Sequence, residues 1–242
     1  MTVKTPGRDD MAFVDRVYSP VHDAQVALGV HWAPLGEGHI ALRVGSLEDD
    51  RTASGDLSLC DVSILPKLGL KGGSADQWLL DRGVETPIAK FSTSALDDGG
   101  FCVNLPGYEY FLESGLAGSV VMSLSEDLPM TQNGVYRVER QDAAFVLSGK
   151  RAGKVLTQVC ALDFAELTSG DVVLTGVAGV SCMILRQGES SCPHACFRLW
   201  CDSSWACYLW GILVQVTADL DGCVVGAAAH YPQLAEKMID DS

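Results

Sequence analysis

The sequence has no long hydrophobic run and few basic residues. Its 242 residues include 17 Lys and Arg against 31 Asp and Glu, for a formal net charge of −14. Nucleic acids and anionic membrane surfaces are both bound through clustered basic side chains. The uncharged stretch at residues 203–218 is shorter than the roughly 20 residues that a membrane-spanning helix needs. The composition therefore predicts that neither nucleic acid nor a membrane is the partner.

Signals for secretion and for several common chemistries are also missing. Residues 1–30 are mixed and charged, without the continuous apolar core of a secretory signal peptide. We therefore expect a cytoplasmic protein whose nine cysteines are reduced thiols. The sequence contains no Gly-x-Ser-x-Gly elbow, no His-Glu-x-x-His and no Cys-x-x-Cys motif. These absences argue against several families of hydrolases, zinc proteases and redox proteins.

A cluster of cysteines near the C-terminus raises the question of zinc. Cys192, His194, Cys196, Cys201 and Cys207 are the candidate ligands. Zinc needs ligands that converge tetrahedrally, whereas Cys196 and Cys201 are an odd number of residues apart in a predicted strand and face opposite sides. Burial in the core is the favoured interpretation, and we predict no metal site.

Periodic patterns predict a mixed fold. Helices are predicted at residues 74–82, 114–123, 152–160 and 204–220. Strands are predicted at residues 67–71, 101–105, 108–112, 135–139, 144–147, 172–175, 178–185 and 195–201. The order strand–helix–strand–strand–helix–strand predicts an α+β fold built from split βαβ (ferredoxin-like) units with antiparallel sheets.

The first part of the chain looks different from the rest. Residues 1–54 predict a partly mobile N-terminal arm, with one strand at residues 40–44 and an exposed acidic connection at residues 47–51. Residues 55–228 form the predicted main domain. Residues 229–242 are predicted to be a short helix, at residues 233–239, and a tail.

One pair of acidic residues is a candidate for chemistry. Asp97 and Asp98 directly precede the predicted hairpin of residues 101–112. A carboxylate at this position could hold a cationic amine or transfer a proton. The alternative is that Asp-Asp-Gly-Gly forms a solvated turn, which its composition favours.

Two segments together resemble a known family. The first combines Leu-x-Leu-Cys-Asp-Val-Ser at residues 57–63 with the strand and helix of residues 67–80, and the strand at residues 108–112 adds to it. The second is the aromatic run Cys-Asp-Ser-Ser-Trp-Ala-Cys-Tyr-Leu-Trp at residues 201–210. The first segment resembles the folate-binding aminomethyltransferase family, which includes the glycine-cleavage T-protein. The second is similar to the gamma subunit of heterotetrameric sarcosine oxidase, a compact relative of that family.

The resemblance implies a role in one-carbon metabolism. A gamma-type chain would be an accessory subunit of a flavin-dependent, tetrahydrofolate-linked N-methyl amine oxidase. It would then pack against larger flavoprotein subunits that hold the flavin, and it would not be catalytic alone. The alternative is a stand-alone tetrahydrofolate-dependent methyl or aminomethyl transferase, which would bind folate itself.

The resemblance also implies candidate residues for each function. Asp97 or Asp98 matches an acidic residue that supports folate chemistry in the T-protein, and Asp98 and Tyr110 are candidates for contact with tetrahydrofolate. For the accessory subunit, the aromatic candidates for the interface are Trp200, Trp205, Tyr208 and Trp210, since buried aromatics dominate the affinity of interfaces. The alternative is that the three tryptophans lie in the core of this chain.

Overall fold

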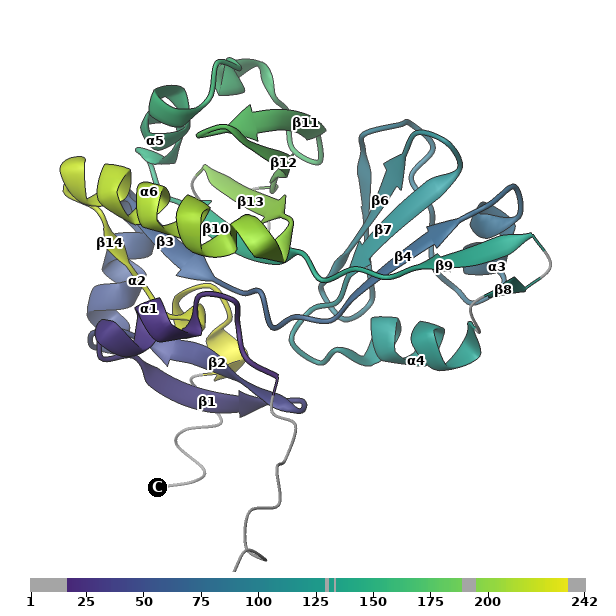
Figure 1. The fold of residues 1–242 in the computed structure, drawn as a ribbon, viewed down its shortest axis with the longest axis horizontal. Helices are drawn as coiled ribbons and strands as arrows, with labels where there is room; N and C mark the ends of the chain where they lie inside the picture. The colour runs from purple at the N-terminus through teal and green to yellow at the C-terminus, as the bar shows by residue number, and fades with distance from the viewer. Residues whose placement is uncertain (1–16, 129–130, 133, 189–194, 235–242) are drawn as a thin grey trace, which may run out of the picture.

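Two six-stranded sheets with helices on their outer faces make up most of the molecule (Figure 1). The computed structural model describes residues 17–128, 131–132, 134–188 and 195–234. Sheet I has, in spatial order, β11 (Val172–Val177), β12 (Val180–Arg186), β13 (Cys196–Cys201), β10 (Ala143–Ser148), β3 (Ser58–Asp61) and β14 (Cys223–Val224). Sheet II has β5 (Thr93–Ala95), β6 (Phe101–Leu105), β7 (Glu109–Glu113), β4 (Lys67–Lys71), β9 (Val135–Val138) and β8 (Thr131–Gln132).

Each sheet contains one split βαβ unit. In sheet II the unit runs from β4 through α3 (Ala75–Leu80), β6, β7 and α4 (Ser119–Asp127) to β9, with the spatial order β6-β7-β4-β9. In sheet I it runs from β10 through α5 (Ala152–Val159), β12, β13 and α6 (Ala206–Asp219) to β14. Strand β3 is inserted between β10 and β14, and it pairs with β14 in parallel. The predicted α+β fold with split βαβ units is confirmed, with this one parallel pair added to antiparallel sheets.

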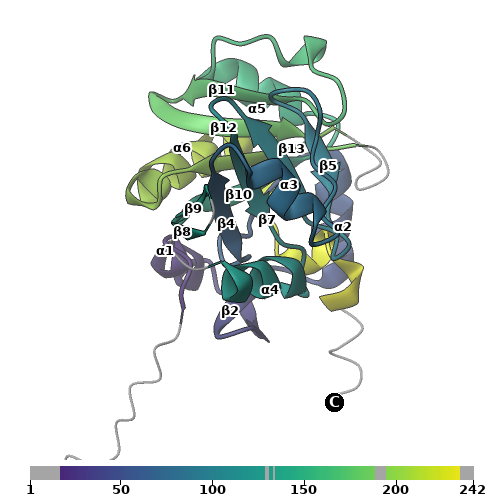
Figure 2. The same cartoon turned by 90° about the vertical axis from the view of Figure 1, so that its right-hand side faces the viewer.

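The core has three parts, which follow from this layering. One lies between sheet I and helices α5 and α6, and it holds Phe145 and Trp210. A second lies between the inner faces of the sheets, and it holds Phe111 and Trp200. The third lies between sheet II and helices α3 and α4, which stand in front of the sheet in Figure 2. Strands β10 and β13 are buried at every position because both faces of sheet I are covered, which explains their nearly continuous apolar sequence.

Several local patterns are confirmed and others are not. The hairpin β6–β7, helix α5 and helix α6 form close to the predicted residues. The helix predicted at residues 114–123 begins later, as α4. Ser74 precedes α3 as predicted, but its side chain makes no capping hydrogen bond. Residues 47–51, predicted as an exposed connection, belong instead to α2 (Leu47–Asp56), because Ser46 caps the helix by accepting from Asp49 N at 3.1 Å.

The described part of the expected N-terminal arm is folded against the rest of the chain. It forms α1 (His22–Ala27), the hairpin β1 (His31–Leu35) and β2 (Gly38–Arg43), and then α2. Ile40 and Leu42 enter the part of the core between the sheets. Residues 1–16 and most of the helix predicted at 233–239 lie outside the described residues. Among the described residues there are also three 3-10 turns: η1 (Phe164–Glu166), η2 (Ser203–Trp205) and η3 (Ala227–Ala229). No helix within the described ranges is long and apolar enough to cross a membrane.

A buried carboxylate attaches this N-terminal segment to the C-terminal part of the chain. Asp50 is 4% exposed, and its two oxygens accept from the amides of Val44 at 3.0 Å, Gly45 at 3.1 Å and Gly226 at 3.0 Å. Such a side chain satisfies three backbone donors that would otherwise be left without acceptors. The sequence pattern did not indicate the contact with Gly226, since this residue is far from Asp50 in the chain.

We predict that Asp50→Ala lowers the free energy of unfolding by about 3 kcal/mol, because three backbone donors lose a charged acceptor. Urea denaturation followed by circular dichroism measures the change. Glu48→Ala, on the exposed side of the same helix, is the matched control, with an expected change within about 0.5 kcal/mol. Equal losses in the two variants would show that Asp50 does not hold the segment in place.

Candidate functional site

A large hollow lies where the inner faces of the two sheets meet. It has a volume of about 650 Å³ and is lined by residues from both sheets, among them Glu109, Arg140, Asp142, Met183 and Trp200. We call it the large hollow. Arg140 bonds to Glu109, which also lies 3.7 Å from Lys71, so these surface charges are paired with each other. Burial raises the pKa of Asp142, and the positive charge of Arg140 opposes this shift.

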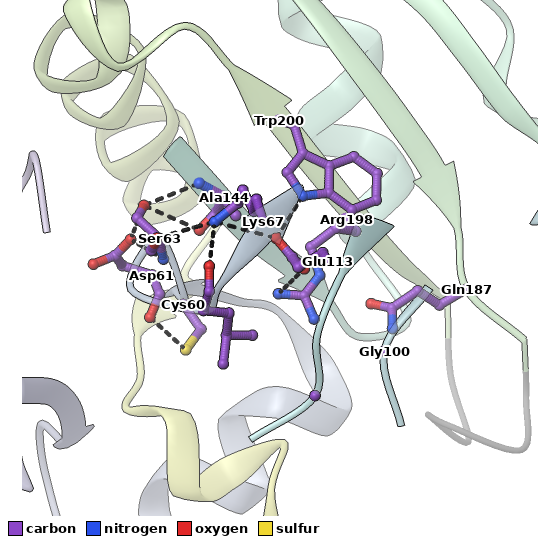
Figure 3. A network of polar contacts seen from close by, with 12 residues as sticks. Cys60, Asp61, Ser63, Lys67, Gly100, Glu113, Ala144, Gln187, Arg198 and Trp200 are labelled. Atoms are coloured by element: carbon purple, nitrogen blue, oxygen red, sulfur yellow. Dashed lines mark hydrogen bonds and ion pairs between the residues drawn. The ribbon is translucent and has the colours of Figure 1, made fainter. Parts of the chain in front are cut away.

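Beneath the large hollow lies a buried group of charges, the central network, formed by Lys67, Glu113, Arg198 and Trp200 (Figure 3). Glu113 has no exposed surface, and it accepts a hydrogen bond of 2.6 Å from Nε1 of Trp200. Its carboxylate lies 3.4 Å from Nζ of Lys67 and 3.5 Å from Nη1 of Arg198. The side chains of both cations are almost fully buried. One carboxylate is therefore shared by two buried cations.

Strand register brings these residues together. Lys67 begins β4 and pairs directly with Glu113 at the end of β7, so both side chains stand at the same place on sheet II. Arg198 and Trp200 are two residues apart on β13 of sheet I, and thus project from the same face. The network joins the two sheets through side chains that come from three strands.

The loop after β3 holds Lys67 in position. Its Nζ donates to the carbonyls of Ser63 at 3.0 Å and Leu65 at 2.9 Å. Ser63 in turn donates from N, at 3.0 Å, and from Oγ, at 2.5 Å, to the carboxylate of Asp61, and its Oγ accepts from N of Ala144 at 2.9 Å. The Asp-Val-Ser element noted in the sequence therefore supports the central network, as Figure 3 shows.

Burial sets the protonation of these groups. It raises the pKa of the Asp61 carboxyl, against the hydrogen bonds from Ser63. It lowers the pKa of the Lys67 ammonium, although the charge of Glu113 acts in the opposite direction. His230 lines a second, smaller hollow beside Arg198, and burial together with the charge of Arg198 lowers its pKa to about 4.

The two acidic candidates have different environments. Asp97 is exposed. The carboxylate of Asp98 accepts hydrogen bonds from three backbone amides. Oδ1 accepts from Gly100 N at 3.1 Å and Gly115 N at 3.0 Å, and Oδ2 accepts from Val120 N at 3.3 Å. Asp98 thus ties the start of the hairpin to the start of α4. Asp98 lies in a turn, as its composition favoured, and the catalytic role considered for it stays a prediction.

The two residues expected to contact folate do not meet. Tyr110 is 6% exposed and lies in the part of the core between sheet II and its helices. It pairs with Asn104 near the turn of the hairpin, whereas Asp98 lies at the open end of the same hairpin, beside Gly115. Burial raises the pKa of the Tyr110 hydroxyl. The structure therefore does not bring Asp98 and Tyr110 together, and their contact with folate stays a prediction.

The aromatic candidates divide into two pairs. Trp200, 1% exposed, and Trp210, 2% exposed, lie in the core of this chain and are corrected from interface to core residues. The ring of Trp210 packs against Phe145, with 5.2 Å between centroids. Trp205 and Tyr208 are 55% and 51% exposed, and their rings touch edge to face with centroids 6.1 Å apart. Only the second pair offers an aromatic surface.

The cysteines considered for zinc lie apart. Cys196 faces the core between the sheets and Cys201 faces the core under helices α5 and α6, which confirms that they point to opposite sides of β13. Cys192 and His194 lie outside the described residues. Within the described ranges, no group of three or more metal-ligating side chains comes together.

Sequence reasoning missed Glu113 and Arg198 as functional residues. Arg198 lies in the strand Cys-Phe-Arg-Leu-Trp-Cys, whose every position is buried. A single charge inside an apolar strand of a sheet covered on both faces is the signal that could have found it, because such a charge needs a buried partner. The identity of that partner depends on the register of another sheet.

Comparison with known proteins shows the fold. No family model and no curated protein matches the sequence. Glycine cleavage system aminomethyltransferase T from Bartonella henselae is similar in structure, with a TM-score of 0.68 and 17% identity over 87% of this chain and 60% of that one. A chain of heterotetrameric sarcosine oxidase from Corynebacterium sp. U-96, solved with pyrrole 2-carboxylate, has a TM-score of 0.60 and 18% identity over 84% of this chain and 95% of that one.

These two similarities confirm the fold that the sequence resemblance predicted. The chain has the aminomethyltransferase fold, and it is also similar to a chain of a sarcosine oxidase. It spans 60% of the length of the Bartonella henselae protein.

We predict that Glu113→Gln lowers the free energy of unfolding by about 3–5 kcal/mol, because two buried cations lose their shared counter-charge. Chemical denaturation measures the loss. Glu109→Gln, on the same strand but partly exposed and paired at the surface, is the control and should cost no more than about 1 kcal/mol. A Glu113→Gln variant as stable as the control would contradict a role of the charge in joining the sheets.

A second prediction concerns His230 and acid. Its pKa is lowered from 6.5 to about 4 in the folded chain, so the unfolded chain binds more protons between these two values. The contribution of His230 to stability is therefore complete above pH 6.5 and is lost as the pH falls toward 4. NMR titration of the imidazole should give a midpoint near 4, whereas a midpoint near 6.5 would show that the ring is solvated.

Proposed function

We propose that this chain is an accessory, gamma-type subunit of a flavin-dependent, tetrahydrofolate-linked N-methyl amine oxidase of the sarcosine oxidase kind. The observation that carries the proposal is that the acidic residue of the central network and the candidate Asp98 are already engaged within the chain. Glu113 neutralises Lys67 and Arg198, and Asp98 accepts from three backbone amides. Carboxylates held in this way stabilise a fold and are poorly suited to move protons.

The similarity in shape supports a subunit role. The matched chain of the heterotetrameric oxidase is covered over nearly its whole length, whereas the aminomethyltransferase extends well beyond the matched part. In the proposed complex, the flavin and the oxidation of the amine belong to larger subunits. The one-carbon unit released there passes to tetrahydrofolate.

The environment of the two residues first expected to hold folate supports assigning folate to another subunit. Asp98 is engaged with the backbone and Tyr110 is buried at the other end of the hairpin. We therefore assign no step of the folate chemistry to this chain. Its proposed contribution is to bind and orient the larger subunits.

The surface for such a partner is proposed to be the pair Trp205 and Tyr208, which we call the α6 patch. These rings lie at the start of α6 and keep half of their surface exposed. Tyr18, also 51% exposed, lines a pocket with Ser203 directly beside the start of the patch. Exposed aromatics that share a patch have a large apolar area to bury, and aromatic residues are enriched among those that dominate binding energy.

The test is to express the tagged chain together with the large flavoprotein subunits of a sarcosine-oxidase-type complex from the same organism. We expect a complex that shows flavin absorbance and oxidises an N-methyl amino acid, and we expect no heat of binding when tetrahydrofolate is added to the isolated chain. Saturable binding of tetrahydrofolate that is lost in Asp142→Asn would instead favour a stand-alone transferase that uses the large hollow.

Variants of exposed aromatic residues distinguish a specific complex from non-specific association. Trp205→Ala and Tyr208→Ala should each weaken association at least about tenfold, equivalent to about 1.4 kcal/mol, without lowering the stability of the isolated chain to a similar degree. Tyr136→Ala is the matched control, since Tyr136 is exposed to the same extent as Tyr208 but lies on sheet II. Equal binding by all three variants would remove the α6 patch from the proposal.

A further inference from the structure

A second hollow, of about 200 Å³, lies toward the other end of β13 from the large hollow. We call it the small hollow. Its walls include Cys196 and Arg198 of β13, whereas Trp200 and Cys201 of the same strand line the large hollow. The two hollows are therefore different sites along β13, with the central network between them.

Arg198 lines the small hollow with hydrogen-bonding capacity to spare. The residue is 2% exposed, and its Nη2 donates to the hydroxyl of Tyr231 at 2.5 Å. Its Nη1 is 3.5 Å from Glu113, too far for a good hydrogen bond, and its Nε has no acceptor among the described residues. A buried guanidinium normally has its donors satisfied, so these two nitrogens point to an acceptor that the described residues do not supply.

The charge on Arg198 is also only partly balanced. Glu113 carries one negative charge, and it serves both Arg198 and Lys67. The acidic residue among those that line the small hollow is Asp98, whose oxygens accept from three backbone amides. An additional anion beside Arg198 would therefore complete the balance of charge.

A second unpartnered group lines the same hollow. Nε2 of His230 is buried and has no hydrogen-bond partner among the described residues. The imidazole is neutral at pH 7, since burial and the charge of Arg198 hold its pKa at about 4. A neutral ring with a proton on Nε2 donates a hydrogen bond without adding charge. The imidazole would add one donor to those of the Arg198 guanidinium, whose planar arrangement of N–H groups matches the shape of a carboxylate.

We propose that the small hollow binds the carboxylate of a small organic acid, with Arg198 and His230 as its donors. Its volume corresponds to six or seven waters at about 30 Å³ each, which is room for an acid of roughly two to four carbons. Phe101, Leu116 and Val146 supply an apolar wall for the short hydrocarbon part. This site requires neither a partner subunit nor folate, and it goes beyond the proposed function.

The experiment titrates the full chain with acetate, propionate and butyrate, following imidazole and guanidinium signals by NMR. We expect saturable binding with a dissociation constant in the millimolar range, as is usual for ligands of so few atoms. Propionamide, which has nearly the same shape without the charge, should bind at least tenfold more weakly. Equal binding of propionamide, or no saturation by any of the three acids, would overturn the proposal and leave water as the occupant of the hollow.

Three variants locate the site. Arg198→Gln removes the guanidinium while Lys67 and Glu113 still balance each other, and it should abolish binding. His230→Gln should weaken binding severalfold, and Leu116→Trp should block the hollow without changing any charge. If Arg198→Gln does not fold, the other two variants still decide the question. Unchanged affinity in either of them would place the acid elsewhere and overturn the proposal.

Discussion

The structure depends on one buried carboxylate that two sheets share. Glu113 ends a strand of sheet II, and it meets Lys67 from the same sheet and Arg198 and Trp200 from the other. Removing three charges from water costs several kcal/mol each, so this contact is a poor source of net stability. Its effect is selective: a shift of either sheet by one residue would leave buried charges without partners, whereas apolar side chains would tolerate such a shift. The network thus fixes how the two βαβ units face each other.

The same network determines what the neighbouring space can do. On β13, residues of even number face the other sheet and residues of odd number face α5 and α6, so Arg198 and Trp200 lie side by side on the inner face. Trp200 closes the base of the large hollow, and Arg198 reaches the wall of the small one. Glu113 accepts a hydrogen bond from Trp200 but lies too far from Arg198 for a good one. Arg198 therefore has unused hydrogen-bond donors on the side of the small hollow. The asymmetry follows from geometry: Oε2 of Glu113 accepts from Trp200 and lies near Lys67, whereas Oε1 lies 3.5 Å from Nη1 of Arg198, too far for a good hydrogen bond.

Much of the fold was predictable because its signals are local. The alternation of Lys67–Lys71, the hairpin around Pro106 and Gly107, and the amphipathic pattern of α5 each depend on neighbouring residues. Helix α2 was missed because its acidic surface resembles a solvated loop, and its position depends on Asp50 reaching Gly226. The candidate site was harder to predict. Composition favoured Asp98 as a turn residue, which the structure bears out, whereas the partners of Arg198 follow from the register of distant strands and leave no trace in the local sequence.

The exposed and buried aromatics show where a binding role is compatible with this architecture. Trp200 and Trp210 are buried in the core. Trp200 packs between the two sheets, and Trp210 packs between sheet I and its helices. Trp205 directly precedes α6, and Tyr208 lies in its first turn, in the same helix as Trp210. Both project from the side of the helix opposite to Trp210 and are half exposed. An exposed aromatic pair of this kind is typical of a surface that another apolar surface covers. Because α6 packs on the buried core of sheet I, the partner proposed to dock on it would meet a preformed surface and lose little entropy in ordering it.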